Sequence, residues 1–417
     1  MQPMIDLETN GVSDVEKFIK SHWEETVRFS PQDNGTVVGL PHPYVVPCRK
    51  DSFQELYYWD TYFACLGLIH SGRADLVIAN LRNFLHLINR FGFIPNGSRT
   101  YYLDRSQPPY FAALVKLMME NGLDEELTAE AIRGIKVEYD FWNNRRNTVV
   151  GLARHGHHAT PDEAREFFLE IKDRAQLDAT GEEEQRQQTS HTLAEAESGW
   201  DFNPRFEHRC EDFCPVDLNS SLFVYEELLA GVTTGEEQQM WLQRAAQRRE
   251  RLTEFCWNPE AGAFFDYDYV NGRQSTILAA STFHPLWTGI ATAKQAALVK
   301  EKALPRLELE FAIVTCEAGP RKKTCQWDHP NAWPCLQIIA YRGLARYGYT
   351  EDARRIAWKY VSTVCRGFAA TGDLWEKYNA QDGSTHTRGE VGYVAPAMMG
   401  WTAGAFLDAV AYLRESA

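Results

Sequence analysis

Several features that define common functional classes are missing from this chain. No apolar stretch approaches 18 residues, so we expect no membrane-spanning helix. The N-terminus MQPMIDLETNGVSDVEKF lacks the basic start and apolar run of a signal peptide. The sequence also lacks a phosphate-binding loop, a dinucleotide fingerprint and a nucleophile elbow, so these chemistries are poorly supported.

The cysteines and histidines do not form a metal-binding pattern. The nine cysteines are an odd number and mostly scattered, and Cys210 and Cys214 have no second Cys or His pair to complete a zinc site. The run His-Gly-His-His at 155–158 lacks the spacing of metalloprotease ligands. We therefore expect reduced thiols, a cytoplasmic location and neither a metal nor another cofactor.

The charge balance narrows the possible partners. The chain has 57 acidic and 43 basic residues and a formal net charge of -14, which argues against nucleic acid or an anionic membrane. Aromatic residues are plentiful, with 12 Trp, 18 Tyr and 22 Phe. Such rings either fill a large core or stack on sugar faces in a binding site. We expect a small-molecule partner and leave the oligomeric state open.

Apolar residues recur with the period of an α-helix along most of the chain. The predicted helices cover 14–27, 59–71, 74–89, 109–121, 127–142, 217–231, 235–256, 333–346, 350–363 and 396–413, with a weaker pair near 283–303. The segment 264–276 instead predicts a short β-hairpin with Asn271-Gly272 as its turn.

Two kinds of helix alternate in this pattern. Segments such as 127–142 are amphipathic, whereas 63–69, 336–345 and 395–413 are apolar or small nearly all round and belong inside. This alternation predicts an all-α (α/α)6 toroid of six inner and six outer helices with short β-hairpin insertions, forming one catalytic domain over 1–417. Residues 155–196 include a polar, weakly patterned stretch at 173–196. We predict an insertion or lid there, and disorder fits equally well.

Motif-rich segments precede the predicted inner helices. They cover 53–63, 95–110, 197–206, 326–334 and 375–393. In a toroid, the segments that enter the inner helices meet at one mouth. Residues far apart in sequence should therefore converge there, and this convergence favours a sugar-binding role for their aromatic rings.

Two carboxylates in these segments suit the hydrolysis of a glycosidic bond, which requires an acid and a base on either side of it. Asp201 lies between Trp200 and Phe202, an apolar wall that would raise its pKa and suit a general acid. Glu390 lies in an irregular stretch before the last helix and suits the general base. The competing residues are Glu376, Asp373 and Asp382. Local sequence also fits a turn residue for Asp201 and an exposed loop for Glu390.

Further residues of these segments predict contacts to sugar hydroxyls. A carboxylate beside an aromatic ring is a common sugar clamp, and Trp59-Asp60 and Trp327-Asp328 fit it, although a helix cap fits Asp60 equally well. Arg105 and Gln107 precede two prolines that fix the backbone, and a structural ion pair is an alternative for Arg105. The other predicted contacts are Tyr57, Asn96, Tyr102, Trp200, Gln326, Trp333, Trp375, Glu376 and Trp401.

Five segments resemble the trehalase-like glycoside hydrolases in order and spacing. They are YYWDTYF, FGFIPNGSRTYYLDRSQPP, ESGWDF, VDLNSSLF and QWDHPNAWP, and the resemblance covers roughly residues 45–410. It implies an (α/α)6 barrel that inverts configuration without a metal, with the general acid at Asp201 and the general base at Glu390. It also implies substrate contacts at Trp59, Asp60, Asn96, Arg105, Gln107, Gln326, Trp327 and Asp328.

The chain departs from the trehalase pattern at three places. Ser52 stands where trehalases carry the Arg of Pro-Gly-Gly-Arg-Phe, HTRGEVGY replaces a glycine run, and Trp333-Pro334-Cys335 replaces Trp-Pro-Pro. These departures are closest in character to the glucosylglycerate and mannosylglycerate hydrolases. We therefore expect inverting hydrolysis of 2-O-α-glucosylglycerate or 2-O-α-mannosylglycerate. Candidate cations for the glycerate carboxylate are Arg105, Arg388, Arg49 and Arg205.

Three alternatives remain open at this stage. The first is an α,α-trehalase, and the second is a related α-glucosidase or mannosidase. The third belongs to a different class, a sugar-binding protein without catalysis. The presence of both Asp201 and Glu390 argues against the third.

Overall fold

The computed structural model describes residues 11–387, 389 and 393–416. Within this part of the chain, six helices form a closed inner ring. Each contacts the next, and the last returns to the first, in the order α2, α4, α8, α10, α13 and α15. Their bounds are α2 (Tyr58–His70), α4 (Phe111–Glu120), α8 (Val216–Val232), α10 (His284–Thr288), α13 (Pro334–Arg346) and α15 (Gly400–Glu415).

An outer layer of helices surrounds this ring. Most of its members follow an inner helix in sequence and lie outside it, as α3 does on α2 and α9 on α8, whereas α1 precedes the ring and packs on α14. They are α1 (Val12–His22), α3 (Ala74–Phe91), α5 (Glu125–Arg145), α9 (Gly235–Cys256), the short pair α11 (Ala293–Leu298) and α12 (Leu304–Leu307), and α14 (Thr350–Thr371). The described chain therefore has the predicted (α/α)6 arrangement.

The difference between the two layers follows from their residues. In α2 the side chains from Tyr58 to Leu68 are all buried, and α8, α13 and α15 are buried along most of their lengths. In α9 the buried positions reduce to a stripe of five residues, and the other side chains face outward. An apolar helix must lie inside, whereas a striped helix covers it. The predicted helix bounds agree with these elements to within a few residues, except that α1 ends at His22 rather than at 27, α14 continues to Thr371 and α15 begins at Gly400.

Short strands lie in the loops between the helices. The antiparallel pairs are β1 (Val27–Arg28) with β2 (Tyr44–Val45), β4 (Trp257–Asn258) with β5 (Ala263–Phe264), and β8 (Asn331–Ala332) with β9 (Tyr378–Asn379); β6 (Tyr267–Asp268) pairs with both β3 (Phe213–Cys214) and β7 (Arg273–Gln274). The predicted hairpin is β6–β7, and Gly272 in its turn adopts a φ of 67°. Single helical turns are η1 (Trp23–Thr26), η2 (Thr100–Tyr102), η3 (Cys210–Asp212), η4 (Ala280–Phe283) and η5 (Val299–Ala303).

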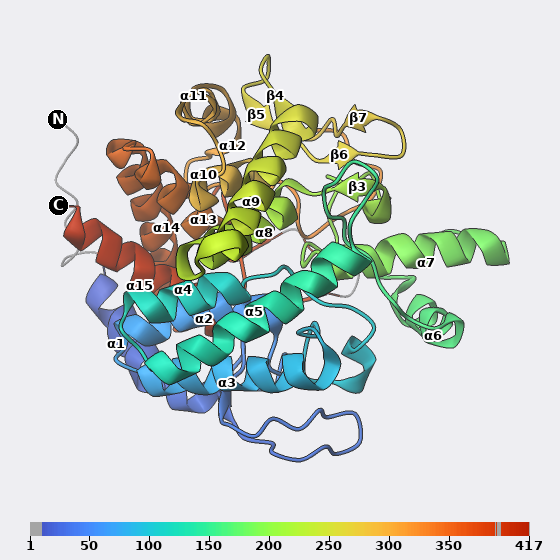
Figure 1. Cartoon of the computed structure of the whole chain (residues 1–417). Coiled ribbons are helices and arrows are strands. Elements are labelled where there is room, and N and C mark those ends of the chain that lie inside the picture. The colour runs from blue at the N-terminus through green and yellow to red at the C-terminus, as the bar shows by residue number, and fades with distance from the viewer. Residues whose placement is uncertain (1–10, 388, 390–392, 417) are drawn as a thin grey trace.

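The segment predicted as a polar insertion or lid contains two helices. α6 (Pro161–Ile171) and α7 (Glu182–Glu197) pack on each other and project from the body of the molecule in Figure 1. The sequence carried a signal for α6, because Thr160 and Glu163 form a capping box with Pro161 at the first helical position. The polar composition of α7 concealed its helical period, since its buried residues lie in its second half. None of the described helices is long and apolar enough to cross a membrane.

The closest contact in the ring joins α2 to α15. A Cβ atom added at Gly404 would lie 1.8 Å from the carbonyl oxygen of Phe63, and one added at Gly67 would lie 2.8 Å from Cα of Gly404. Both obstacles are backbone atoms, so a larger side chain would force the two helices apart. Glycine at these two positions therefore allows the ring to close.

We predict that Gly404→Ala destabilises the fold. Separating α2 from α15 should cost about 2 kcal/mol and lower the melting temperature measured by circular dichroism. Gly231→Ala is the matched control, because Gly231 lies near the end of α8 with no atom within 4 Å of an added Cβ. The control should melt at the same temperature or slightly higher. Equal melting of both variants would contradict the close-contact account.

Candidate active site

A pocket of about 290 Å³ opens where the segments before the inner helices meet. The structure brings thirteen predicted site residues into its wall. They are Tyr57, Trp59, Asp60, Asn96, Tyr102, Arg105, Gln107, Asp201, Gln326, Trp327, Trp333, Glu376 and Trp401. They come from the approaches or first turns of α2, α4, α13 and α15 and from the loop after α7. The expected convergence of distant motifs is thus present in the structure.

Three predicted residues, all of them described, are not part of the pocket wall. Trp200 is fully buried behind Trp327, with ring centroids 5.1 Å apart. Asp328 forms an ion pair with Arg321 at 2.9 Å. Trp375 directs its indole N–H to Thr371 Oγ1 at 3.0 Å. Each of these three side chains packs in the structure that surrounds the pocket, and direct sugar contact by them stays a prediction.

The predicted general base lies outside the described residues. Glu390 and the candidate cation Arg388 fall in the undescribed positions between Thr387 and Tyr393. Their assignments therefore stay predictions. The neighbouring Tyr393 is described, and it lines the pocket.

Indole rings form the apolar side of the pocket. Trp327 and Trp333 stack in parallel with centroids 3.8 Å apart and an interplanar angle of 3°. Trp59 lies 5.6 Å from Trp327, and Trp401 meets both Trp327 and Trp333 nearly perpendicularly. Such flat apolar surfaces can stack on the C–H faces of a pyranose. The rings also limit water access to the carboxylates beside them.

Asp201 contacts this wall in a partly enclosed setting. Its side chain is 31% exposed, and its Oδ2 accepts a hydrogen bond from Arg174 Nη2 at 3.2 Å. Desolvation raises the pKa of Asp201 above its ordinary value, and the positive charge of Arg174 opposes this shift. Gln326 Nε2 donates to the Asp201 backbone carbonyl at 2.6 Å and so fixes the main chain. A raised pKa favours the protonated form of the carboxyl, which a general acid needs.

Asp60 lies in the first turn of α2 and is nearly fully buried. The pKa of Asp60 is raised to about 7, chiefly by burial and also by the negative charges of Glu376 and Asp201. Groups that repel one another in this way cannot all ionise freely. The protonation states of Asp60, Asp201 and Glu376 are therefore linked.

Glu376 is, with Asp60, the second buried carboxylate of the wall, and it has its own cation. Lys377 Nζ donates to Glu376 Oε2 at 2.6 Å, and the Tyr393 hydroxyl donates to Oε1. The Trp401 indole N–H donates to the Glu376 carbonyl at 3.0 Å. Sequence reasoning overlooked Lys377 and Tyr393, because neither residue has a distinctive local pattern. Their roles depend on a chain reversal that brings Tyr393 back to Glu376.

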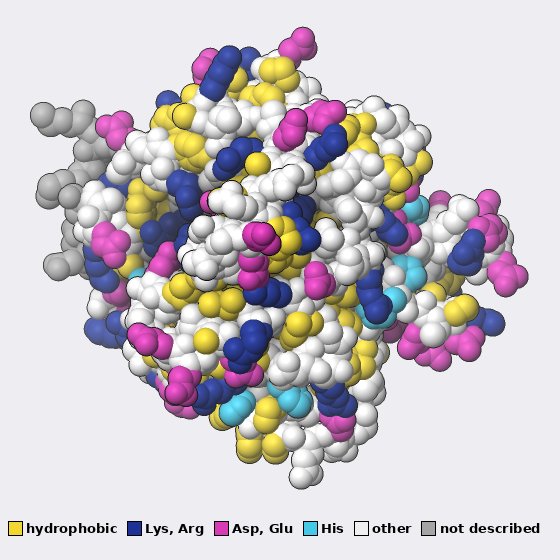
Figure 2. All heavy atoms as spheres, in the orientation of Figure 1, with side chains coloured by type: hydrophobic (Ala, Val, Ile, Leu, Met, Phe, Trp, Pro, Cys, Tyr) yellow, Lys and Arg dark blue, Asp and Glu magenta, His cyan; other side chains and the backbone are white. Residues whose placement is uncertain are grey.

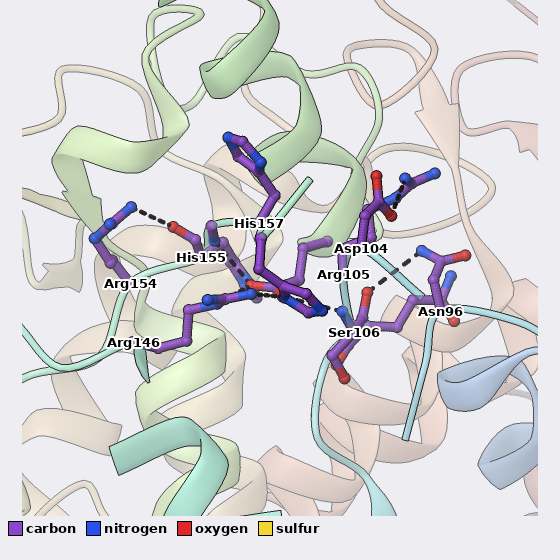
Figure 3. Close-up of polar contacts among 12 residues, drawn as sticks. Asn96, Asp104, Arg105, Ser106, Arg146, Arg154, His155 and His157 are labelled. Carbon is purple, nitrogen blue, oxygen red and sulfur yellow. Dashed lines mark hydrogen bonds and ion pairs between the residues drawn. The ribbon is translucent and has the colours of Figure 1, made fainter. Parts of the chain in front are cut away.

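A buried ion pair supports the segment that carries Arg105 and Gln107. Arg146 donates to both oxygens of Glu197 at 2.9 and 2.7 Å, and Glu197 also accepts from the Ser106 and Gly156 backbone N–H groups at 3.0 and 2.8 Å. In Figure 3, Arg146 and His155 lie on one side of this cluster of polar contacts, and Ser106 lies on the other side. Burial alone would raise the pKa of Glu197, but Arg146 and His155 hold it well below its usual range. Glu197 thereby ties the ESGWDF segment to the Arg-Ser-Gln segment.

One face of α6 and its following turn forms the remaining wall, which sequence analysis did not predict. Its residues follow a helical spacing and are Glu163, Glu166, Phe167, Glu170, Ile171 and Arg174. Figure 2 shows acidic side chains gathered over this projecting hairpin. The capping box at Thr160 would have predicted the helix, but not the direction of its inner face.

The candidate cations for a glycerate carboxylate are mostly engaged elsewhere. Arg205 is buried between Asp217 and Asp266, and it contacts the face of Trp200. Arg49 pairs with Glu25 and Asp373. Arg105 lines the pocket and pairs with Asp104 at 2.7 Å, while its buried Nε has no hydrogen-bond partner. Of the described candidates, Arg105 alone reaches the pocket. Among the described residues, no group of three or more His, Cys, Asp or Glu could hold a metal ion.

Comparison with known proteins identifies one family. The trehalase family profile matches residues 6–414. The chain is 33% identical over 392 residues to the cytosolic neutral trehalase of Neurospora crassa, a match that covers 81% of this chain and 52% of that protein. The chain therefore spans about half the length of this curated relative.

Solved structures extend the similarity. The neutral trehalase Nth1 from Saccharomyces cerevisiae matches with a TM-score of 0.77 and 28% identity, covering 96% of this chain and 81% of that one. A GH63 mannosylglycerate hydrolase from Thermus thermophilus, in complex with glucose, matches with a TM-score of 0.64 and 15% identity, covering 96% and 100%. The second likeness supports the fold alone. The predicted trehalase-like resemblance and the (α/α)6 toroid are confirmed.

We predict that Asp60 makes stability depend on pH. Its pKa is raised from 3.8 to about 7 in the folded chain, so ionisation of Asp60 destabilises the fold as pH rises through this window. Asp60→Asn removes this penalty. As pH rises from 5 to 8, the unfolding free energy of the variant should increase by about 3 kcal/mol relative to that of wild type. Urea titrations at the two pH values measure it, with the exposed Asp140→Asn as control. If the unfolding free energies of Asp60→Asn and wild type differ by the same amount at both pH values, the prediction is contradicted.

Proposed function

The chain belongs to the trehalase family, and on that premise we propose that it is an inverting glycoside hydrolase whose substrate is α,α-trehalose. The observation that carries this proposal is the 33% identity with the Neurospora crassa neutral trehalase across 81% of this chain. The departures from the trehalase motifs favoured a glycosylglycerate as the substrate. This chain, however, shares only 15% identity with the mannosylglycerate hydrolase. Trehalose, the alternative in the sequence analysis, is therefore the better-supported substrate. We also extend the cytosolic location of the relative to this chain.

The charge of the pocket supports a neutral substrate. Its described wall holds seven carboxyl groups against two guanidinium groups. The acids are Asp60, Asp104, Glu163, Glu166, Glu170, Asp201 and Glu376, and the cations are Arg105 and Arg174. A glycerate carboxylate would enter this field against repulsion, with Arg105 already paired to Asp104. A neutral disaccharide meets no such barrier, and carboxylates are good acceptors for its hydroxyl groups.

In the proposed mechanism, Asp201 is the general acid. Protonated Asp201 donates its proton to the oxygen that bridges the two sugars, and the bond from that oxygen to the anomeric carbon breaks. A water molecule attacks the anomeric carbon from the opposite face, and a second carboxylate accepts its proton. The water needs space, so the two carboxyl groups should lie roughly 6.5–9.5 Å apart. Trp59 and Asp60 are proposed to hold the sugar that is cleaved.

Two glutamates are candidates for the general base. The motif resemblance implies Glu390, which lies outside the described residues. Glu376 is buried in the pocket wall, where Lys377 Nζ and the Tyr393 hydroxyl donate to its two carboxylate oxygens. We propose Glu390 as the base, as the resemblance implies, with Glu376 as the alternative.

Two glutamine variants separate these candidates. Glu390→Gln should lower kcat on trehalose by at least about 1,000-fold, because the attacking water loses its proton acceptor. Glu376→Gln should keep a larger share of the activity, because Glu376 then acts in binding. Asp201→Asn should also lose nearly all turnover while still binding trehalose in calorimetry. A Glu376→Gln variant that is inactive beside an active Glu390→Gln would reverse the assignment.

A substrate panel tests the proposed specificity. Purified protein should hydrolyse α,α-trehalose at least about 100-fold more efficiently, in kcat/KM, than glucosylglycerate or mannosylglycerate. Proton NMR of the first turnover should show equal amounts of α- and β-glucose, because water enters one sugar with inversion and the other leaves with its configuration retained. Faster hydrolysis of either glycerate compound would refute trehalose, and α-glucose alone would refute inversion.

A further inference from the structure

A second cavity, here called the rear cavity, opens at the opposite end of the inner ring from the candidate active site. Its volume is about 890 Å³, and the residues of its described wall all belong to the six inner helices. The active-site pocket includes first-turn residues such as Trp59 of α2 and Trp401 of α15. The rear cavity instead includes late residues such as Glu120 of α4, Gly231 of α8 and Arg346 of α13. The two cavities therefore lie at the two mouths of the toroid.

Aromatic rings separate the rear cavity from the active-site pocket. The ring of Tyr110, a buried residue, has its centroid 6.3 Å from that of Trp59 in the active-site pocket and 5.6 Å from that of Trp287 in the rear cavity. The Tyr62 ring lies 5.1 Å from Tyr110 and 6.1 Å from Trp287. Tyr62 and Trp287 thus give the rear cavity an aromatic surface of its own. A ligand on this surface would not occupy the site of hydrolysis.

Tyr62 carries a hydroxyl group that the rest of the described chain leaves without a hydrogen bond. Its side chain lines the rear cavity and is only 7% exposed. Burial raises the pKa of this hydroxyl, and the charges of Asp408 and Arg342, which line the same cavity, also act on it. A buried hydroxyl normally has a hydrogen-bond partner. A polar ligand in the rear cavity would supply one.

Two further polar groups of the wall are available to a ligand. No described residue accepts a hydrogen bond from the Trp287 indole N–H, and the exposed Glu227 carboxylate forms no ion pair within the described chain. Arg342, by contrast, donates to both oxygens of Asp408 at 3.0 and 2.7 Å, and this pairing fixes both side chains. The wall therefore combines an aromatic surface with both hydrogen-bond donors and acceptors. This combination suits a ligand with many hydroxyl groups.

The charges of the rear cavity favour a neutral ligand. Its described wall holds equal numbers of acidic and basic side chains, which are Glu120, Glu227 and Asp408 against Lys116, Arg342 and Arg346. Two ion pairs form within this set, Lys116 with Glu120 at 3.8 Å and Arg342 with Asp408 at 2.7 Å. An anion or a cation would meet repulsion as well as attraction here. A neutral ligand meets neither and can use both kinds of side chain as hydrogen-bond partners.

We propose that the rear cavity is a second binding site, which takes a neutral sugar. The sugar stacks on the Tyr62 and Trp287 rings and forms hydrogen bonds with the Tyr62 hydroxyl, the Trp287 indole N–H and the Glu227 carboxylate. This site goes beyond the proposed function, because it is separate from the site of hydrolysis. It depends on neither catalytic carboxylate.

NMR of protein labelled with 15N at tryptophan tests the proposal with glucose as the probe. Trp287 reports on the rear cavity and Trp59 on the active-site pocket, and Trp287→Phe assigns the Trp287 indole signal. Glucose should shift this signal in a saturable way. Tyr62→Phe should weaken the binding seen at Trp287 by about 3- to 10-fold, the effect of losing one hydrogen bond, and leave the titration at Trp59 unchanged. The matched control is Tyr267→Phe in β6, outside the walls of both cavities, which should titrate like the wild type.

Three outcomes would overturn the proposal. The first is a Trp287 signal that glucose does not shift, whatever happens at Trp59. The second is a Trp287 titration that matches that of Trp59 in the wild type and in Tyr62→Phe, because the effect would then be transmitted from the active-site pocket. The third is tighter binding of glucuronate, an anionic sugar, than of glucose at Trp287.

A second variant covers the case in which Tyr62→Phe does not fold. Glu227→Gln changes an exposed position and should also weaken glucose binding at Trp287, because the charged acceptor is lost. Unchanged binding in this variant would overturn the proposed contacts. None of these measurements uses hydrolysis as its readout. Absence of trehalose turnover would therefore refute the proposed function and leave the rear site standing.

Discussion

The inner ring closes because α2 and α15 meet backbone against backbone. Gly67 and Gly404 leave no space for a Cβ at this contact, and larger residues there would open the ring. Closure fixes the position of the site, since the segments that lead into the inner helices then share one mouth. Trp59 enters with α2, Trp333 with α13 and Trp401 with α15. The position of the pocket therefore follows from the topology of the helices rather than from any single motif.

Several acids lie close together in that pocket away from water, so their negative charges would repel one another. The surroundings of the acids differ. Burial raises the pKa of Asp60 to about 7, Asp201 has a raised pKa beside Arg174, and Glu376 has a direct ammonium partner. Environments that push the protonation states of neighbouring acids apart are what an acid–base pair requires. The support extends outward to Glu197, which Arg146 keeps ionised in the wall behind Arg105.

Sequence reasoning predicted the ring and the mouth, because helical periodicity and the contrast between apolar and striped helices are local properties. It predicted that Trp59, Asp60 and Asp201 meet at one mouth, and the three residues line one pocket, since each lies in a segment that enters the inner layer. It could not predict side-chain orientation, and Trp200 and Asp328 adjoin the site but face other partners. It also missed Lys377 and the inner face of α6, because their importance depends on contacts between distant segments. The departures at Ser52 and Cys335 suggested a different substrate, whereas similarity over the whole chain favours trehalose.

The central claim is the proposal that Asp201 and Glu390 flank one glycosidic bond with space for a single water molecule. A crystal structure of Asp201→Asn with bound trehalose tests it most directly. The account predicts the disaccharide between these side chains, carboxyl positions roughly 6.5–9.5 Å apart, and a water molecule hydrogen-bonded to Glu390 below the anomeric carbon. Trehalose bound elsewhere, or a separation near ~5 Å without such a water, would contradict it.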